Sequence, residues 1–185
     1  MQLTDLLPID DWICIEKEIN RRSGLDAAVF DTNGFRITGF KKWANRLCPV
    51  IKANDKGQSF ICAVAHMNIA TAAKKSRQPF TEECDGGLVK ACVPIIVDDT
   101  YLGALCGCGM VLDDGEVDTF LINKITGIDE EKLQELSSDV RYITSDEIDS
   151  VVDYMSETIT TIIKKYKVNH YETLHKESIR RQNSD

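Results

Sequence analysis

The sequence predicts an α+β fold, in which an antiparallel sheet is flanked by helices and followed by a long C-terminal helix. Apolar segments with strand character occur in two consecutive pairs, each joined by a short polar turn, as in antiparallel hairpins. Segments with helical spacing stand before, between and after these pairs instead of alternating with single strands, which argues against a parallel sheet. With 185 residues, of which 43% are hydrophobic, the chain is long enough to bury a core of its own.

The first half of the chain is expected to contain a helix, a hairpin and two further helices. The acidic pair Asp10-Asp11 can cap the first helix, and Ser23-Gly24 can close it. A strand over residues 26–31 then leads into Asn33-Gly34, which is a strong hairpin signal. The returning strand and the two helices are expected over residues 36–40, 43–54 and 57–77.

The second half is expected to begin with another hairpin. Residues 82–87 have the composition of a turn, and the apolar runs 88–97 and 101–112 follow it. Pro94 predicts an edge position or a bulge in the first of these strands, because proline cannot donate a hydrogen bond to a neighbouring strand. Two short helices are then expected over residues 117–126 and 129–138.

A long helix is expected from about Ser145 onwards. Its apolar residues are alternately four and three positions apart, which is the spacing of a coiled-coil seam. These residues are Ile148, Val152, Met155, Ile159, Ile162 and Tyr166. We therefore divide the chain into a first part, residues 1–144, and a C-terminal helix for dimerisation, residues 145–185, and we expect a homodimer through residues 148–166. The alternative is a long helix that packs on its own sheet.

Composition argues against several classes of protein. Lys and Arg number 22 and Asp and Glu number 30, and the resulting net charge of −8 argues against direct binding of nucleic acid. No apolar run reaches the roughly 18 residues that a membrane span needs. The N-terminal sequence Met-Gln-Leu-Thr-Asp lacks the basic region of a signal peptide, so a cytoplasmic location is expected.

Seven cysteines are the unusual feature of the composition. A disulfide framework is not expected in a cytoplasmic protein, and an odd number of cysteines cannot pair completely within one chain. Cys62 and His66 are four residues apart on a predicted helix and therefore share a face, as a metal-ligand pair or a thiolate–imidazole pair would. The alternative for this pair is a core cysteine beside a partly exposed histidine.

Cys106 and Cys108 are two residues apart on a predicted strand, so their side chains are expected on one face of the sheet. Leu102, Ala104 and Met110 are expected on the same face, while Gly107 and Gly109 leave little bulk on the other. This pattern is compatible with a binding face and also with a cysteine-rich part of the core.

Cys84 lies in a polar turn among acidic residues. Glu82, Glu83 and Asp85 would raise the pKa of its thiol, which argues against a catalytic nucleophile but not against a metal ligand. The chain also lacks a phosphate-binding glycine loop, a His-Glu-x-x-His helix and a Gly-x-Ser-x-Gly elbow. We therefore expect a protein that is not an enzyme.

An ordered series of motifs in the middle of the chain resembles the PocR ligand-sensing domain. The series is Leu47-Cys48, Cys62, the turn from Cys84 to Leu88, Val93-Pro94-Ile95, Tyr101-Leu102-Gly103 and the glycine-flanked strand to Gly109. The resemblance covers about residues 26–112 and implies a PAS-like bacterial sensory domain that binds small hydrocarbon derivatives such as short diols.

The resemblance also assigns individual positions. It matches Cys48, Cys62 and Cys84 to the recurrent cysteines of the family, and Gly87, Leu88, Pro94 and Gly103 to structural positions. After its last strand the family commonly has Gly-Gln, whereas this chain has Cys106-Gly107-Cys108-Gly109, which favours a softer ligand such as a metal or a cluster. Cys14, outside the matched region, and Cys92, before Pro94, are expected to be packing residues.

Two functions are compatible with these patterns. The first is a non-enzymatic sensory domain that relays ligand binding through its C-terminal helix to an output domain or a partner signalling protein. Its ligand-binding residues would be Cys48, Cys62, His66, Cys84, Gly87, Cys106 and Cys108. The second is a redox sensor that holds an iron–sulfur cluster or zinc with Cys48, Cys62, Cys84 and either Cys106 or Cys108. A structural interaction domain with an empty core, and a cysteine-nucleophile enzyme built on Cys62 and His66, are less favoured.

Overall fold

The computed structural model describes the backbone of residues 1–182 and the side chains of residues 1–172. Its sheet has the strand order β1-β4-β3-β2, with antiparallel neighbours throughout, and β5 pairs in parallel with the end of β4. The strands are β1 (Asp26–Asp31), β2 (Phe80–Glu83), β3 (Val89–Val97), β4 (Thr100–Leu112) and β5 (Tyr142–Ile143). The predicted α+β fold with an antiparallel sheet is therefore confirmed.

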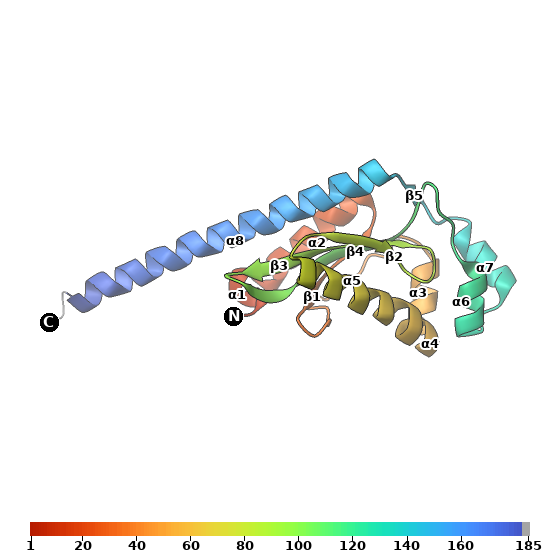
Figure 1. Cartoon of the computed structure of the whole chain (residues 1–185), viewed down its shortest axis with the longest axis horizontal. Coiled ribbons are helices and arrows are strands. Elements are labelled where there is room, and N and C mark those ends of the chain that lie inside the picture. Colours follow the sequence, from red (N-terminus) through yellow and green to blue (C-terminus); the bar gives the residue numbers. More distant parts are fainter. Residues whose placement is uncertain (183–185) are drawn as a thin grey trace.

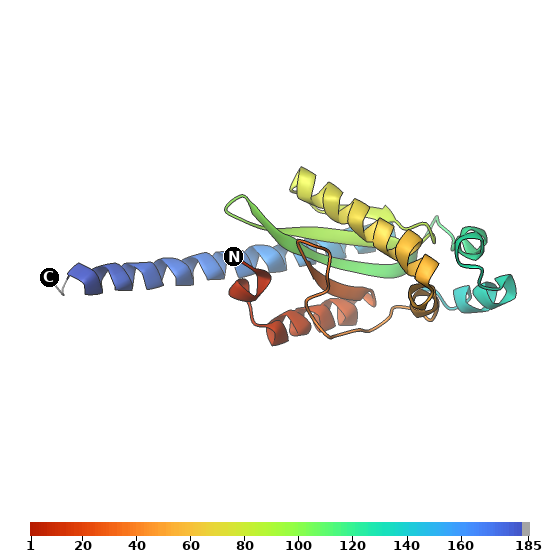
Figure 2. The same ribbon diagram turned by 90° about the horizontal axis from the view of Figure 1, so that it is seen from below.

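Helices cover both faces of this sheet, as Figures 1 and 2 show. We call the two sides the α8 face, which α2 and α8 cover, and the α5 face, which α5 covers. The helices are α1 (Leu3–Leu6), α2 (Ile9–Ser23), α3 (Leu47–Ala53), α4 (Asp55–Gly57), α5 (Ala63–Ser76), α6 (Thr119–Thr126), α7 (Glu130–Ser137) and α8 (Ser145–Gln182). A π-helix over Gln58–Cys62 joins α4 to α5, so the predicted helix over 57–77 begins with a wider turn.

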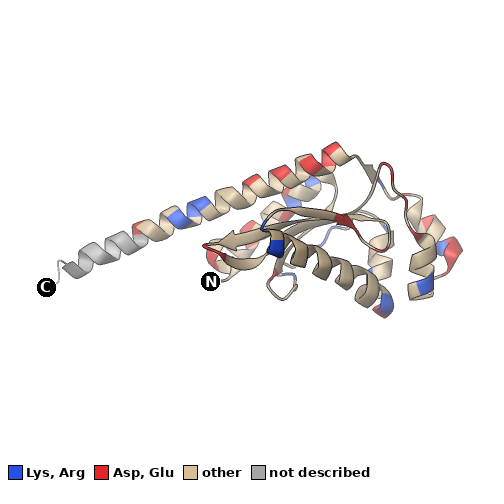
Figure 3. Cartoon of the chain, in the orientation of Figure 1, with Lys and Arg blue, Asp and Glu red and all other residues tan. Residues whose placement is uncertain are grey.

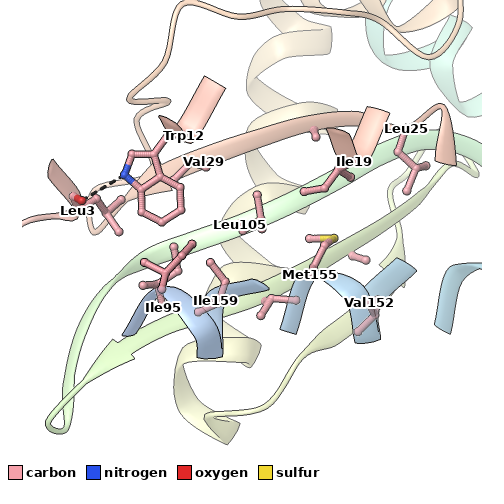
Figure 4. Packing of buried hydrophobic residues seen from close by; sticks show 14 of the residues in the cluster. Leu3, Trp12, Ile19, Leu25, Val29, Ile95, Leu105, Val152, Met155 and Ile159 are labelled. Atoms are coloured by element: carbon pink, nitrogen blue, oxygen red, sulfur yellow. Dashed lines mark hydrogen bonds between the residues drawn. The ribbon is translucent and has the colours of Figure 1, made fainter. Parts of the chain in front are cut away.

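The main hydrophobic core lies on the α8 face (Figure 4). Trp12 of α2 is fully buried there, and its indole N–H donates to the carbonyl oxygen of Leu3 at 3.1 Å. Leu105 of β4 meets Met155 of α8 in the same layer. Burying side chains of this size contributes about 1.5–3 kcal/mol each, so this face supplies much of the stability of the fold.

The first half of α8 belongs to this core. The predicted seam residues Ile148, Val152, Met155, Ile159 and Ile162 are all buried against the sheet and α2 of the same chain. The long helix thus packs on its own sheet, and the expectation that these side chains form a dimer seam is wrong for them. Lys167 of α8 still pairs with Asp98 in the β3–β4 turn at 2.6 Å, and the remainder of the helix projects away from the sheet (Figure 1).

The first predicted hairpin is reduced to a single antiparallel bridge, and its returning strand does not form. Gly34 donates to the carbonyl oxygen of Asp31 in the predicted turn, but residues 36–40 add only one bridge, between Phe30 and Arg36. β1 pairs instead with β4 along its whole length. On its outer edge, the Val29 N–H donates to a carboxylate oxygen of buried Glu16 of α2 at 2.8 Å, and the Val29 carbonyl oxygen accepts the Ile37 N–H at 3.0 Å.

The second hairpin is confirmed. β3 and β4 pair from Val89 to Val97, and Asp98 and Asp99 turn the chain with positive φ angles of 45° and 66°. β2 accompanies β3 only as far as Cys92, so Pro94 lies where β3 is an edge strand, close to a register shift after Ile95. Phe80–Glu83, partly assigned to a turn from the sequence, form the exposed strand β2, and the turn begins at Cys84.

Candidate functional site

A β-bulge on β4 decides which side chains face α5. Lys90 pairs with Cys108 and the preceding Val89 pairs with Met110, so Gly109 is an extra residue in β4. Gly109 has a φ of +106°, and a Cβ atom there would lie 2.8 Å from the Cβ of Ala44. Residues two apart on a regular strand face the same side of the sheet, but the bulge separates Cys108 from Met110. Cys108 faces α5, whereas Met110 packs into the core on the α8 face.

The predicted face of β4 is therefore only partly right. Ala104 and Cys106 pack together beneath α5, as expected. Leu102 and Met110 belong to the core on the other side, because register shifts occur at both ends of the β3–β4 pairing. Register shifts of this kind leave no mark in the alternation of apolar and polar residues along the sequence.

Two rows of facing residues cross the sheet on the α5 face. In the first row Cys108 pairs with Asp26 of β1 on one side and Lys90 of β3 on the other. In the second row Cys106 pairs with Ala28 and Cys92. Residues directly opposite in antiparallel strands share a face, so sulfur, carboxylate and ammonium groups are concentrated on one side of the sheet.

Cys92 and Cys106 form a disulfide across β3 and β4, with a Cα–Cα distance of 4.2 Å. This corrects two expectations, since Cys92 is not only a packing residue and Cys106 is not a free thiol. Both residues are buried. The expectation for Cys14 is also wrong, because Cys14 is exposed.

The four remaining cysteines converge from four different elements. We call them the thiol cluster: Cys48 of α3, Cys62 at the end of the π-helix, Cys84 in the turn after β2, and Cys108 of β4. Burial raises the pKa of the Cys48 thiol, and the neighbouring Cys108, Cys84 and Cys62 raise it further. Burial, followed by Cys84, raises the pKa of Cys62 to about 11. At neutral pH these thiols are therefore protonated unless a cation stabilises their thiolates.

Asn45, which sequence reasoning did not select, anchors Cys48. The Cys48 N–H donates to the side-chain oxygen of Asn45 at 2.7 Å. The Asn45 amide donates to the Gly109 carbonyl oxygen at 2.6 Å and lies 3.4 Å from the Cys48 sulfur. The amide thereby ties α3 to the bulge of β4 and holds Cys48 over the α5 face.

A tight turn positions Cys84. Its N–H donates to the Leu88 carbonyl oxygen at 2.9 Å, and its carbonyl oxygen accepts the Gly87 N–H at 2.8 Å. Gly87 has a φ of +74°, and a Cβ atom there would collide with the backbone oxygen of Glu116. Gly87, which was included among the ligand-binding residues, thus shapes the turn that carries Cys84.

Lys90 is the unexpected member of the site. Only 8% of it is exposed, and no hydrogen bond or ion pair joins it to any residue that the structure describes. Its ammonium lies 5.6 Å from the centre of the Phe30 ring. Burial lowers the pKa of Lys90, and the nearby Cys108, Cys62 and Cys84 oppose that shift. A buried lysine amine near three of the four thiols is well placed to meet an anionic or strongly polar ligand.

His66 lies one helical turn after Cys62, under the turn at Gly34. Only 8% of it is exposed, and neither ring nitrogen has a hydrogen-bond partner among the described residues. Its ring centre is 4.0 Å from that of Phe30. Burial, followed by Lys90 and Lys52, lowers the pKa of His66 to about 4, so the imidazole is neutral at neutral pH.

The structure thus contains two sulfur groups of different geometry. Among the described residues, His66, Cys92 and Cys106 are the one set of three such ligands whose donor atoms all lie within 4.8 Å of one another. No three sulfurs of the thiol cluster lie within 4.8 Å of one another. In a closed zinc site, where each sulfur is about 2.3 Å from the metal, the four sulfurs lie closer together than this. An open groove of about 780 Å³ lies elsewhere, between α1, α2 and α8, and no cysteine lines it.

Comparison with known proteins identifies one family. The family model described as "Sensory domain found in PocR" matches residues 5–166. No curated protein and no solved structure matches the chain. No helix within the described residues has the length and apolar character needed to cross a membrane.

Proposed function

The chain belongs to the family of sensory domains found in PocR, and on this basis we propose that it binds a small ligand at the thiol cluster and Lys90. The observation that carries the proposal is that Cys62, Cys84 and Cys108 lie near Lys90, which is buried and has no hydrogen bond or ion pair among the described residues. Cys48 lies near the same three thiols. Family membership indicates a non-catalytic role. His66 and the π-helix border the same region, and short π-helical segments within α-helices occur frequently at functional sites.

Relay through α8 is the second part of the proposal. Lys90 and Cys108 lie on the α5 face of β3 and β4, while Met155 and Ile159 of α8 pack on the opposite face of the same strands. A ligand that binds the two states of these strands unequally would shift the packing of α8. In this proposal residues 1–144 sense the ligand and residues 145–185 transmit the change.

An output domain or partner signalling protein would receive the signal from the far end of α8. The helix is acidic at its start and carries Lys164, Lys165 and Lys167 where it leaves the sheet (Figure 3). Because the apolar seam is buried within the chain, a homodimer would use the opposite side of α8 or its extension beyond Tyr166.

A thermal-shift screen of small molecules tests the site. Short diols, the corresponding aldehydes and small carboxylates are added to the reduced protein, and active compounds are repeated with Lys90→Met, Cys62→Ser and Cys14→Ser. The proposal expects the shift to disappear in the first two variants and to persist in Cys14→Ser, which changes an exposed cysteine. Equal shifts in all three variants, or no active compound, would contradict it.

A metal centre is the second candidate function, and the four free thiols of the thiol cluster favour it. Cys48, Cys62, Cys84 and Cys108 could hold zinc or an iron–sulfur cluster. Cys108 is the fourth ligand in this proposal, because Cys106 is bonded to Cys92. Protein purified without oxygen should then contain stoichiometric metal, with broad absorption in the blue for a cluster. A colourless, metal-free protein would contradict this candidate and leave the small-ligand proposal standing.

A further inference from the structure

We propose that Cys92, Cys106 and His66 form a second site, separate from the thiol cluster, that binds a soft divalent cation such as Zn²⁺ once the disulfide is reduced. The disulfide would then be a redox gate for metal binding. The proposal does not depend on the small-ligand function or on metal binding by the thiol cluster.

Geometry is the first support. The two sulfurs come from directly opposite positions on β3 and β4, and the imidazole reaches them from α5. All three donor atoms lie within 4.8 Å of one another, and all three residues are buried. Two thiolates and one imidazole are a known ligand set for zinc with one position left open.

His66 is the second, independent support. A buried polar atom without a hydrogen bond destabilises the fold, and His66 has two such nitrogens among the described residues. The neighbouring residues offer little compensation, because Ile69, Ala73 and Ala104 are apolar. A cation bound between the sulfurs and one ring nitrogen would satisfy an atom that the oxidised protein leaves without a partner.

The redox step requires a two-electron reductant, here a dithiol. The S–S bond between Cys92 and Cys106 breaks as it takes up two electrons and two protons from the reductant, which becomes a disulfide. Zn²⁺ then displaces both thiol protons. The product carries two thiolates, one neutral imidazole and one divalent cation, so it has no net charge. Neutrality favours binding in this apolar environment, where an uncompensated charge would be costly.

Reduction would therefore change more than a covalent bond. His66 and Cys62 are four residues apart on the helix that borders the thiol cluster. Metal capture by His66 would fix this part of α5 against β3 and β4. The second site could in this way make ligand binding at the thiol cluster sensitive to redox conditions.

Zinc stoichiometry measured against a chromophoric chelator tests the proposal on the full chain. The oxidised protein is compared with protein reduced by a phosphine and then freed of it, because a dithiol would compete for zinc. Reduction should add one zinc equivalent per chain. The added equivalent should disappear in His66→Gln, which leaves the disulfide intact, and in the double variant Cys92→Ser/Cys106→Ser.

Cys62→Ser is the matched control, because it changes the same helical region and spares the three proposed ligands. It should retain the zinc equivalent that depends on reduction, whatever the thiol cluster binds. Far-UV circular dichroism checks that each variant is folded. If the double variant does not fold, the zinc stoichiometry of His66→Gln alone tests the site. No gain of zinc on reduction, or a gain that survives His66→Gln, would overturn the proposal.

Discussion

The two faces of the sheet differ sharply although they are built from the same strands. On the α8 face, β3 contributes Val89, Ala91 and Val93 to a continuous apolar core. On the α5 face, the intervening residues of the same strand are Lys90, Cys92 and Pro94. Because side chains alternate along a strand, one strand can supply stability on one side and reactive groups on the other.

This difference indicates a division of roles. The α8 face has the features of a stabilising core, with closely packed side chains and the fully buried Trp12 and Met155. Among the residues that the structure describes, the buried lysine on the α5 face has no counter-ion and the histidine there has no hydrogen bond. Such groups reduce stability, and their concentration on one face of the sheet is typical of functional sites.

Truncation on the α8 face should have the largest effect on stability. Met155 is fully buried, so Met155→Ala removes buried surface and leaves a cavity. We expect a loss of about 3 kcal/mol in the free energy of unfolding, measured by urea denaturation. Val168→Ala, in the part of α8 beyond the sheet where the side chain is 58% exposed, should change it by less than about 0.5 kcal/mol. Similar losses in both variants would show that α8 does not pack on the sheet as described.

Removing the bulge should disturb both faces at once. Gly109→Ala places a Cβ atom at a positive φ and against Ala44, so we expect a loss of about 2 kcal/mol. The same variant should weaken the site, because Asn45 bonds to the Gly109 carbonyl oxygen and holds Cys48. Gly39→Ala is the control, since nothing lies within 4 Å of its added Cβ atom. A fully stable Gly109→Ala protein would argue against the bulge.

A substitution on the α5 face should change stability in the opposite direction. Lys90→Met replaces a buried, unpaired ammonium by an apolar side chain of similar length, so we expect a gain of about 1–2 kcal/mol in the free energy of unfolding. Lys75→Met, at the exposed end of α5, is the control and should have little effect. If Lys90→Met is clearly destabilised, Lys90 makes a structural contribution that its contacts do not reveal.

Local patterns were sufficient for most of the elements. Helical spacing and capping residues located α2, α5 and α8 to within a few residues, and Asp98-Asp99 correctly marked the turn of the β3–β4 hairpin. The restriction that proline places on hydrogen bonding also located Pro94 correctly at an edge. These features depend on residues close together in the chain, which is why the sequence reveals them.

Long-range features could not be predicted in the same way. The seam spacing of α8 is the same whether the apolar stripe meets a second helix or its own sheet, so the sequence could not choose between them. The disulfide depends on the register that places Cys92 opposite Cys106. Lys90 has the sequence context of any strand lysine, and its burial depends on tertiary packing over β3, to which α5 contributes.

The covering of β1 leads to the prediction with the smallest effect. Glu16 takes the place of a neighbouring strand, because it accepts hydrogen bonds from the Val29 N–H and the Thr38 hydroxyl. Burial is the main cause that raises the pKa of Glu16 above its ordinary value of 4.5, and these hydrogen bonds only partly oppose it. The folded protein therefore holds a proton on Glu16 more tightly than the unfolded chain does.

Stability attributable to Glu16 should accordingly fall as pH rises from 4.5 through the higher pKa of the folded state, with a slope below about 1.4 kcal/mol per pH unit. Glu16→Gln keeps an acceptor oxygen and should remove this slope in urea denaturation between pH 4.5 and 8. Glu18 on the same helix is the matched control, because hydrogen bonds from Arg21 and Arg22 lower its pKa to about 2. The stabilisation by Glu18 is present above pH 4.5 and is lost as pH falls toward 2, so Glu18→Gln should leave the slope above pH 4.5 unchanged. If Glu16→Gln retains the wild-type slope, another group causes it, and burial does not raise the pKa of Glu16 in the folded protein as expected.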